Sequence, residues 1–209
     1  MPIFTSDWFS AHIHSWQYIF RKVGWAAEQP KVVIEIGSYE GRASIWILEN
    51  LLKNPESRLF CVDTFADADL PTSYGSRFKA NLAEARNGPD DNRPHIYAGL
   101  SSDFLLQFNV LKNQADFIYV DGSHRASDVL VDLVLSFRIL RVGGVIICDD
   151  YLGGASHDLL LDSPKLAIDA FTNIFRDQIE IINGVPLYQI AFRKIADRSQ
   201  DDPSSRGEA

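Results

Sequence analysis

The chain has 209 residues, of which 46% are hydrophobic and 23% charged, a balance that fits one globular α/β domain. Its formal net charge of −8 argues against binding to a nucleic-acid backbone, which would need a basic face. No apolar stretch approaches the roughly 20 residues that span a bilayer, and polar side chains interrupt residues 1–20, so we expect no membrane contact, no secretory signal and a cytoplasmic location.

Residues 1–30 form a segment that we separate from the main domain. Within it, residues 5–26 carry the apolar spacing of an amphipathic helix. This helix can cover a site as a lid, pack on the sheet or meet a second subunit. A homodimer is therefore one of the alternatives. Trp8 and Trp16 of this segment, together with Tyr151, are candidates to line an acceptor pocket, although an aromatic stripe of this kind more often belongs to the core.

From residue 31 to residue 195, strand and helix patterns alternate. This order predicts a Rossmann-like, doubly wound and mostly parallel sheet. The predicted strands cover residues 32–36, 59–62, 95–98, 116–120 and 144–148, and the predicted helices cover 43–53, 76–86, 102–109, 126–140 and 165–175. Residues 179–182 and 187–192 flank Asn183-Gly184, which predicts a C-terminal antiparallel hairpin. The tail, residues 196–209, is rich in Asp, Ser, Arg and Gly and is predicted to be disordered.

The first predicted strand leads through a short loop, residues 37–41, into a helix. Open α/β sheets build nucleotide sites in this way. A dinucleotide pyrophosphate needs bare backbone and no negative charge at such a loop, whereas this one carries Tyr39 and Glu40 between its glycines. A cationic or neutral nucleoside ligand tolerates both residues. The loop therefore favours S-adenosylmethionine over NAD.

Four segments, residues 35–42, 61–65, 117–124 and 143–151, together resemble the class I S-adenosylmethionine-dependent methyltransferases. More narrowly, they resemble the small O-methyltransferase-like branch that includes macrolide-sugar and aminocoumarin-sugar O-methyltransferases. The resemblance covers roughly residues 32–194. It implies methyl transfer to an oxygen of a small-molecule acceptor, with a sugar hydroxyl or a natural-product phenol favoured. A nitrogen acceptor stays open.

Acidic residues stand where the predicted strands end, which is the edge where ligands of parallel sheets gather. Asp63, Asp121 and Asp149 concentrate negative charge at this edge, which suits a sulfonium ligand. Asp63 lies roughly 20 residues beyond the loop, where a carboxylate can accept both ribose hydroxyls, with a turn cap as the alternative. The predicted cofactor-binding residues are Glu35, Gly37, Ser38, Gly41, Ser44, Asp63, Thr64, Ser101 and Asp121.

Several of these roles have alternatives. The resemblance implies that Glu35 orients the methionine end of the cofactor, while structural pairing of a buried acid is the other reading. Ser38 and Ser44 can cap the following helix or bind the cofactor carboxylate. The segment around Ser101 follows the third strand, where the family places its adenine pocket, and Ser102 can instead cap a helix.

Asp121, Asp149 and Asp150 form the predicted metal site. The strands before them should be neighbours, so their carboxylates can converge on Mg²⁺ and leave positions open for water or substrate. In the resembled O-methyltransferases the matching acids hold such an ion, which lowers the pKa of an acceptor hydroxyl and orients it. The alternative is that these acids cap helices or turns, or pair with Lys or Arg.

His124, three residues beyond Asp121, is the predicted general base, and Asp121 shares the catalytic assignment. His157 is a second candidate, and substrate positioning or packing is the alternative for His124. Two rival functions remain: an NAD-dependent oxidoreductase, and a catalytically silent cofactor-binding scaffold. The cluster of Asp121, His124, Asp149 and Asp150 argues against the scaffold.

Overall fold

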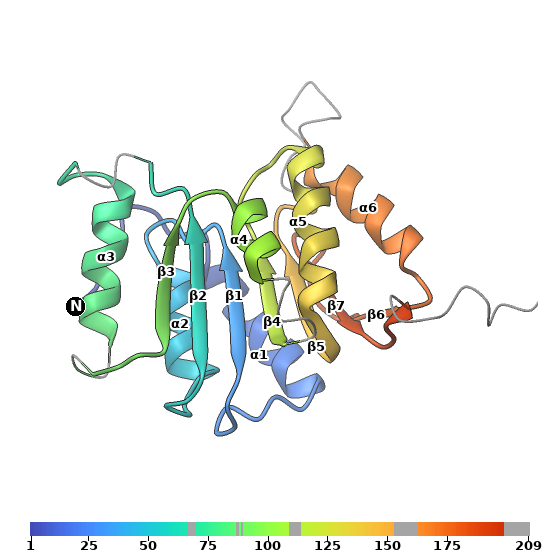
Figure 1. Cartoon of the computed structure of the whole chain (residues 1–209), viewed down its shortest axis with the longest axis horizontal. Coiled ribbons are helices and arrows are strands. Elements are labelled where there is room, and N and C mark those ends of the chain that lie inside the picture. Colours follow the sequence, from blue (N-terminus) through green and yellow to red (C-terminus); the bar gives the residue numbers. More distant parts are fainter. Residues whose placement is uncertain (67–69, 87, 89, 109–113, 153–162, 199–209) are drawn as a thin grey trace, which may run out of the picture.

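A computed structural model of the chain describes residues 1–66, 70–86, 88, 90–108, 114–152 and 163–198. It contains a seven-stranded sheet in the order β3-β2-β1-β4-β5-β7-β6 (Figure 1). The first five strands pair in parallel, and β7 runs antiparallel to both β5 and β6. The strands are β1 Val32–Ile36, β2 Arg58–Asp63, β3 Pro94–Ala98, β4 Ala115–Val120, β5 Leu140–Cys148, β6 Ile179–Ile181 and β7 Ile190–Lys194. The predicted Rossmann-like fold with its antiparallel C-terminal pair is confirmed.

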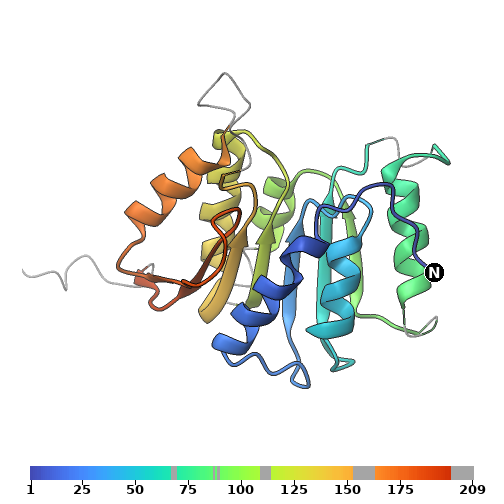
Figure 2. The ribbon, with the colours of Figure 1, turned by 180° about the vertical axis from the view of Figure 1, so that it is seen from behind.

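Helices cover the sheet on both faces, as the opposite views of Figures 1 and 2 show. Successive residues of a strand point to opposite faces, so Ile34 packs in the core that contains Leu133 of α5, whereas Val33 packs in the core that contains Trp16 of α1. The short helix η1 and the α-helices are η1 Ser10–His12, α1 Ile13–Lys22, α2 Arg42–Asn50, α3 Tyr74–Ala85, α4 Ser101–Phe108, α5 Ala126–Ile139 and α6 Pro164–Ile174. In the described residues, no helix is long and apolar enough to cross a membrane.

The register of the parallel strands aligns their carboxyl ends. Ile36 of β1 is level with Val62 of β2 and with Val120 of β4, and Val120 is level with Cys148 of β5. The loops that follow these strands therefore meet at one edge of the sheet. This alignment brings together residues that are far apart in the sequence.

The N-terminal segment differs from its prediction. Instead of one helix over residues 5–26, residues 1–9 precede η1 without helix or strand structure, and α1 begins only at Ile13. The Asp7 side chain accepts from the Ser10 backbone N–H and marks the helical start. Before it, the backbone groups of Ile3 and Thr5 bond to side chains of distant elements rather than to a helix of their own.

The connection between β6 and β7 is also longer than predicted. β7 begins at Ile190 rather than Leu187, so Asn183-Gly184 does not form a two-residue turn between the strands. The reason is that the Tyr188 carbonyl accepts from the Tyr151 N–H, which draws the residues before β7 towards the end of β5. Of the predicted disordered tail, Arg198 forms an ion pair with Asp177 at 2.6 Å, and residues 199–209 lie outside the described part of the chain.

Candidate active site

A cavity of about 1040 Å³ opens at the carboxyl edge of the parallel strands. Residues from the loops after β1, β2, β3, β4 and β5 line it, and Trp8, His12 and Tyr188 complete the lining from other segments. Five of the predicted cofactor-binding residues lie on its wall: Gly37, Asp63, Thr64, Ser101 and Asp121. The other four, Glu35, Ser38, Gly41 and Ser44, are buried and do not belong to this wall.

The loop at residues 37–41 has a backbone that only particular residues adopt easily. Gly37 has φ +87°, and a Cβ at this position would lie 2.0 Å from the Asp121 carbonyl oxygen. Gly41 precedes α2 with φ +85° and no side-chain cap. The requirement for glycine at these positions is therefore conformational: a left-handed backbone at both, and a close approach to the end of β4 at Gly37.

Glu35 lies beneath this loop, fully buried in β1. One carboxyl oxygen accepts from the hydroxyls of Ser38, at 2.9 Å, and Ser44, and the other has no hydrogen-bond partner among the described residues. Burial raises the pKa of Glu35 to about 7. The two serines thus donate to Glu35, and α2 has no side-chain cap. The helix-capping role considered for Ser38 and Ser44 is therefore wrong.

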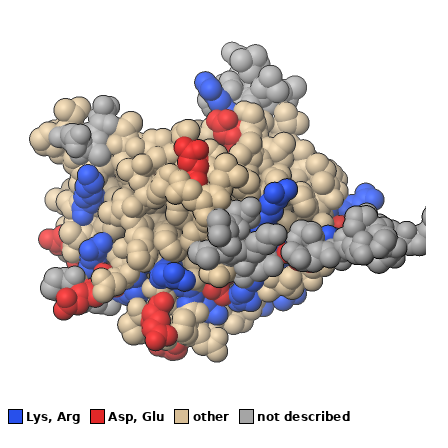
Figure 3. Space-filling view, in the orientation of Figure 1, with Lys and Arg blue, Asp and Glu red and all other residues tan. Residues whose placement is uncertain are grey.

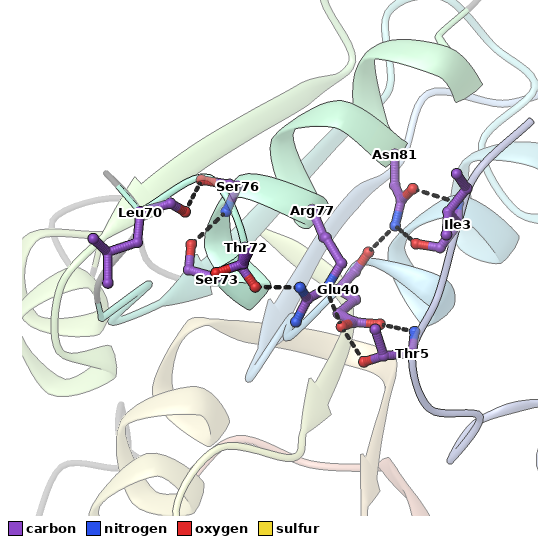
Figure 4. Close-up of polar contacts among 9 residues, drawn as sticks. All are labelled: Ile3, Thr5, Glu40, Leu70, Thr72, Ser73, Ser76, Arg77 and Asn81. Carbon is purple, nitrogen blue, oxygen red and sulfur yellow. Dashed lines mark hydrogen bonds and ion pairs between the residues drawn. The ribbon is translucent and has the colours of Figure 1, made fainter.

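Glu40 is not part of the cavity wall, and it ties the loop to two other segments (Figure 4). Its carboxylate accepts from the Thr5 N–H at 2.7 Å and the Thr5 hydroxyl at 2.6 Å, and it pairs with Arg77 of α3 at 2.5 Å. Asn81 bonds both the Glu40 carbonyl and the backbone of Ile3. The negative charge of Glu40 is therefore paired with Arg77, outside the cavity wall.

Asp63 reaches the cavity from the end of β2, with its carboxylate held by the backbone around it. One oxygen accepts from the Tyr39 N–H, and the other accepts from the Phe65 N–H, each at 2.9 Å. The Tyr74 hydroxyl also donates to it, at 3.2 Å. The ring of Tyr39 stacks between those of Trp8 and Tyr74, with centroids 4.9 and 5.4 Å apart. An aromatic wall therefore stands beside the Asp63 carboxylate.

Ser101 begins α4 and donates its hydroxyl to Asp132 of α5 at 2.6 Å. Asp132 is almost fully buried yet lines the cavity, and burial raises its pKa to about 6. Ser102 lies in the first turn of α4 rather than in front of it. Leu100 and Val131 supply exposed apolar surface on the same wall.

Three carboxylates gather where β4 and β5 end, and each accepts from an uncharged donor. Tyr119 donates to Asp121 at 2.9 Å, the Gln189 amide donates to Asp149 at 2.8 Å, and Tyr188 donates to Asp150 at 2.7 Å. His124 also meets Asp150, with Nε2 at 2.8 Å from Oδ2. One ligand atom each from Asp121, His124 and Asp150 lies within 4.8 Å of the others, a grouping that includes His124 in place of the predicted Asp149.

The pKa shifts in this cluster follow from burial and mutual repulsion. Burial and the neighbouring Asp149 raise the pKa of Asp121 well above its usual range, and burial also raises that of Asp149. The hydrogen bond with His124 lowers the pKa of Asp150 and raises that of His124. Tyr119, Tyr188 and Gln189 orient the three acids without supplying a positive charge, whereas the raised pKa of His124 favours its charged form beside Asp150.

Several residues of the site were not predicted from the sequence: Tyr39, Tyr74, Tyr119, Asp132, Tyr188 and Gln189. Of the predicted aromatic residues, Trp8 lines the cavity, Trp16 is buried beneath it, and Tyr151 donates its hydroxyl to Asp169 instead. His157 lies outside the described residues.

The sequence matches the model of a family described as a methyltransferase domain over residues 34–151, more than half of the chain, and the chain belongs to this family. No curated protein sequence matches it significantly. Together with the fold, the family confirms the predicted class, a methyltransferase of the class I, S-adenosylmethionine-dependent type.

Solved structures share the fold at low identity. An O-methyltransferase from Bacillus cereus in complex with S-adenosylhomocysteine is 17% identical, with a TM-score of 0.65 over 91% of this chain and 84% of that one. CalS11, a TDP-rhamnose 3′-O-methyltransferase of calicheamicin biosynthesis, is 17% identical, with a TM-score of 0.62 over 88% and 79%. MycE from the mycinamycin pathway, in complex with Mg and S-adenosylhomocysteine, is 15% identical, with a TM-score of 0.61 over 95% and 53%.

Proposed function

We propose that this protein transfers a methyl group from S-adenosylmethionine to a hydroxyl oxygen of a small acceptor, with the assistance of a divalent cation. The observation that carries the proposal is one cavity with two differently equipped ends. Asp63 and the aromatic wall line it beyond β2, and the group of Asp121, His124 and Asp150 lines it beyond β4 and β5, on the other side of β1. Solved structures with the same fold include O-methyltransferases, two of them from natural-product pathways.

The residues around Asp63 fit the nucleoside part of the cofactor. A carboxylate that is already oriented by two backbone N–H groups can accept from the ribose hydroxyls, and Leu100 and Val131 offer apolar surface for a base. The lining carboxylates give this cavity a negative potential that attracts a sulfonium. Bound S-adenosylmethionine supplies the methyl group, and the protein's part is to hold the acceptor in line with it.

The acid cluster fits a hard divalent cation. Mg²⁺ prefers carboxylate oxygens and keeps open positions, and Asp121 and Asp150 offer oxygens within 4.8 Å of each other. Asp149, which precedes Asp150, lines the same cavity. Asp121 accepts from Tyr119 and Asp149 accepts from Gln189, two donors without charge, and the repulsion from Asp149 that helps to raise the pKa of Asp121 is what a bound cation would relieve. When bound, the ion lowers the pKa of an acceptor hydroxyl and orients it.

His124 stands at the mouth of the cavity with more than half of its side chain exposed, and Asp150 holds its Nε2 side. We assign it the role of taking the hydroxyl proton. The acceptor is a hydroxylated sugar or a natural-product phenol, as in the families that the sequence resembles. We assign no nucleic-acid or membrane partner, and a homodimer stays a prediction.

The test is methyl transfer from labelled S-adenosylmethionine to a panel of sugars, glycosides and phenols, with Mg²⁺ or with a chelator. His124→Gln should lower turnover about 10²- to 10⁴-fold, the usual contribution of a general base. His14→Gln, at an exposed position of α1 outside the cavity, is the matched control and should retain full turnover. Methylation of nitrogen alone, or equal turnover by the two variants, would contradict the proposal.

A further inference from the structure

The buried Trp16 of α1 reaches the acid cluster through one side chain. Its indole Nε1 donates to Gln189 Oε1 at 2.9 Å, and Gln189 Nε2 donates to Asp149 Oδ1 at 2.8 Å. Trp16 is fully buried, and Gln189 is 2% exposed. A continuous chain of hydrogen bonds therefore joins the N-terminal helix to the site, although Trp16 and Gln189 lie 173 residues apart.

The direction of this chain is set by the groups at its ends. An indole nitrogen only donates, so it requires the oxygen of the Gln189 amide. The amide NH₂ must then face Asp149, whose carboxylate accepts it. The reverse orientation would set two donors together at Trp16 and two acceptors together at Asp149. Trp16 thus determines that Gln189 presents N–H to this acid.

Trp16 itself has little freedom to move. Its ring makes edge contacts with the rings of Phe9 and Phe117, with centroids 4.9 and 5.3 Å away. It also meets Tyr119 edge to face at 4.8 Å, and Tyr119 is the residue that donates to Asp121. Two of the three acids are therefore oriented by groups that contact this one tryptophan.

We propose that Trp16 and Gln189 are positioning residues for the divalent-cation site, because the indole N–H fixes the Gln189 amide and the amide fixes the Asp149 carboxylate. This inference rests on the proposed cation site. Partners that orient the ligands of a metal typically contribute about 10- to 100-fold to metal affinity or activity. Loss of either link should leave the fold and the nucleoside end of the cavity intact.

The test is calorimetric titration with Mn²⁺, as a probe for Mg²⁺, on full-length variants. Trp16→Phe removes the N–H and keeps the ring, and Gln189→Met removes both amide groups. Trp25→Phe is the matched control, because Trp25 packs on the neighbouring rings of Phe20 and Phe117 and donates its indole N–H at 2.9 Å to the Leu51 carbonyl, away from the site.

We expect Trp16→Phe and Gln189→Met each to weaken Mn²⁺ binding about tenfold. The double variant should bind no more weakly than Gln189→Met, since both changes break one chain. S-adenosylhomocysteine affinity without metal should stay at the wild-type value in all variants. Wild-type Mn²⁺ affinity in both single variants, or equal weakening in Trp25→Phe, would overturn the positioning role alone. Absence of Mn²⁺ binding by the wild-type protein would overturn the cation site and this proposal together, while S-adenosylhomocysteine binding would still support the methyltransferase.

Discussion

At the scale of single residues, the site is oriented before any ligand arrives. The Asp63 carboxylate is fixed by backbone N–H groups, and the acids after β4 and β5 are fixed by two tyrosines and a glutamine. None of these donors carries a charge. Acids held this close together repel one another, which raises the pKa of Asp121, costs stability in the free protein and favours a cationic ligand.

Glu35 allows the energetic cost of burying a charged carboxylate to be measured at one position. Its pKa of about 7, against an ordinary value of 4.5, means that the folded state favours its protonated form. The stability that it contributes is fully present below the unfolded pKa and is lost as the pH rises through about 7. Wild-type protein should thus lose roughly 2–3 kcal/mol between pH 5 and pH 8 from this group.

Glu35→Gln should lack that loss because glutamine does not titrate. The difference in unfolding free energy between the variant and the wild type should therefore shift in favour of the variant by the same amount from pH 5 to pH 8. Urea unfolding at a series of pH values measures the difference. Glu49→Gln, on the exposed side of α2, should follow the wild-type curve and serves as the control. Parallel curves for wild type and Glu35→Gln would show that the buried carboxylate keeps an ordinary pKa.

The sequence predicted which acids lie close together where position along a strand decides the neighbours. Asp63, Asp121 and Asp149 follow buried apolar runs, and parallel strands bring such ends together. Gln189 and Tyr188 gave no comparable signal, because they precede a short antiparallel strand and reach acids about 40 residues earlier in the chain. Asp132 was missed because one acid on a helix face normally indicates a solvated position.

At the scale of elements, the N-terminal strap, residues 1–9, joins α3 to the loop at residues 37–41. Thr5 and Glu40 carry this connection, with Asn81 and Arg77 beside them (Figure 4). Trp8 at the end of the strap stacks on Tyr39 and lines the cavity. The strap is therefore positioned to hold the cofactor loop rather than to form the first turns of a helix.

Thr5→Ala should lower the free energy of unfolding by about 1.5–3 kcal/mol, as expected for a hydrogen bond to a charged group. It should also weaken S-adenosylhomocysteine binding, because Glu40 then holds the loop less firmly. Thr172→Ala is the matched control, since that hydroxyl bonds only backbone carbonyls within α6. Thermal unfolding and calorimetry measure the two effects. A loss of stability with unchanged affinity would limit the strap to a structural role.

The βα units were predicted from the sequence with small errors at their ends, because buried parallel strands are continuous apolar runs between polar turns. The strand at residues 32–36 agrees fully with β1. The two failures share one cause. Both the strap and the segment before β7 bond their backbone to distant residues, such as Asn81 and Tyr151, and local patterns carry no information about such partners.

At the scale of the whole molecule, the charge distribution agrees with a small cationic or neutral ligand. In the described part of the chain, no lysine or arginine lines the cavity, whereas six aspartates do. On the face drawn in Figure 3, basic and acidic side chains are interspersed. A dinucleotide would meet these carboxylates with its pyrophosphate, at an unfavourable electrostatic cost.

The oxidoreductase alternative would need a Tyr and a Lys of the dehydrogenase type at the cavity. The chain contains one Tyr-x-x-x-Lys spacing of the kind that short-chain dehydrogenases use, at Tyr18 and Lys22 of α1. Both side chains donate to the Asn183 carbonyl, and neither lines the cavity. This pair therefore stabilises the contact between α1 and the β6–β7 connection rather than a hydride-transfer site.

The most direct measurement is calorimetric titration of the purified protein with S-adenosylhomocysteine and, separately, with NAD⁺. We predict saturable binding of one S-adenosylhomocysteine per chain, lost in Asp63→Ala, and no binding of NAD⁺. Binding of NAD⁺ without binding of the adenosyl ligand would contradict the proposed cofactor and, with it, the methyl-transfer reaction assigned to this cavity.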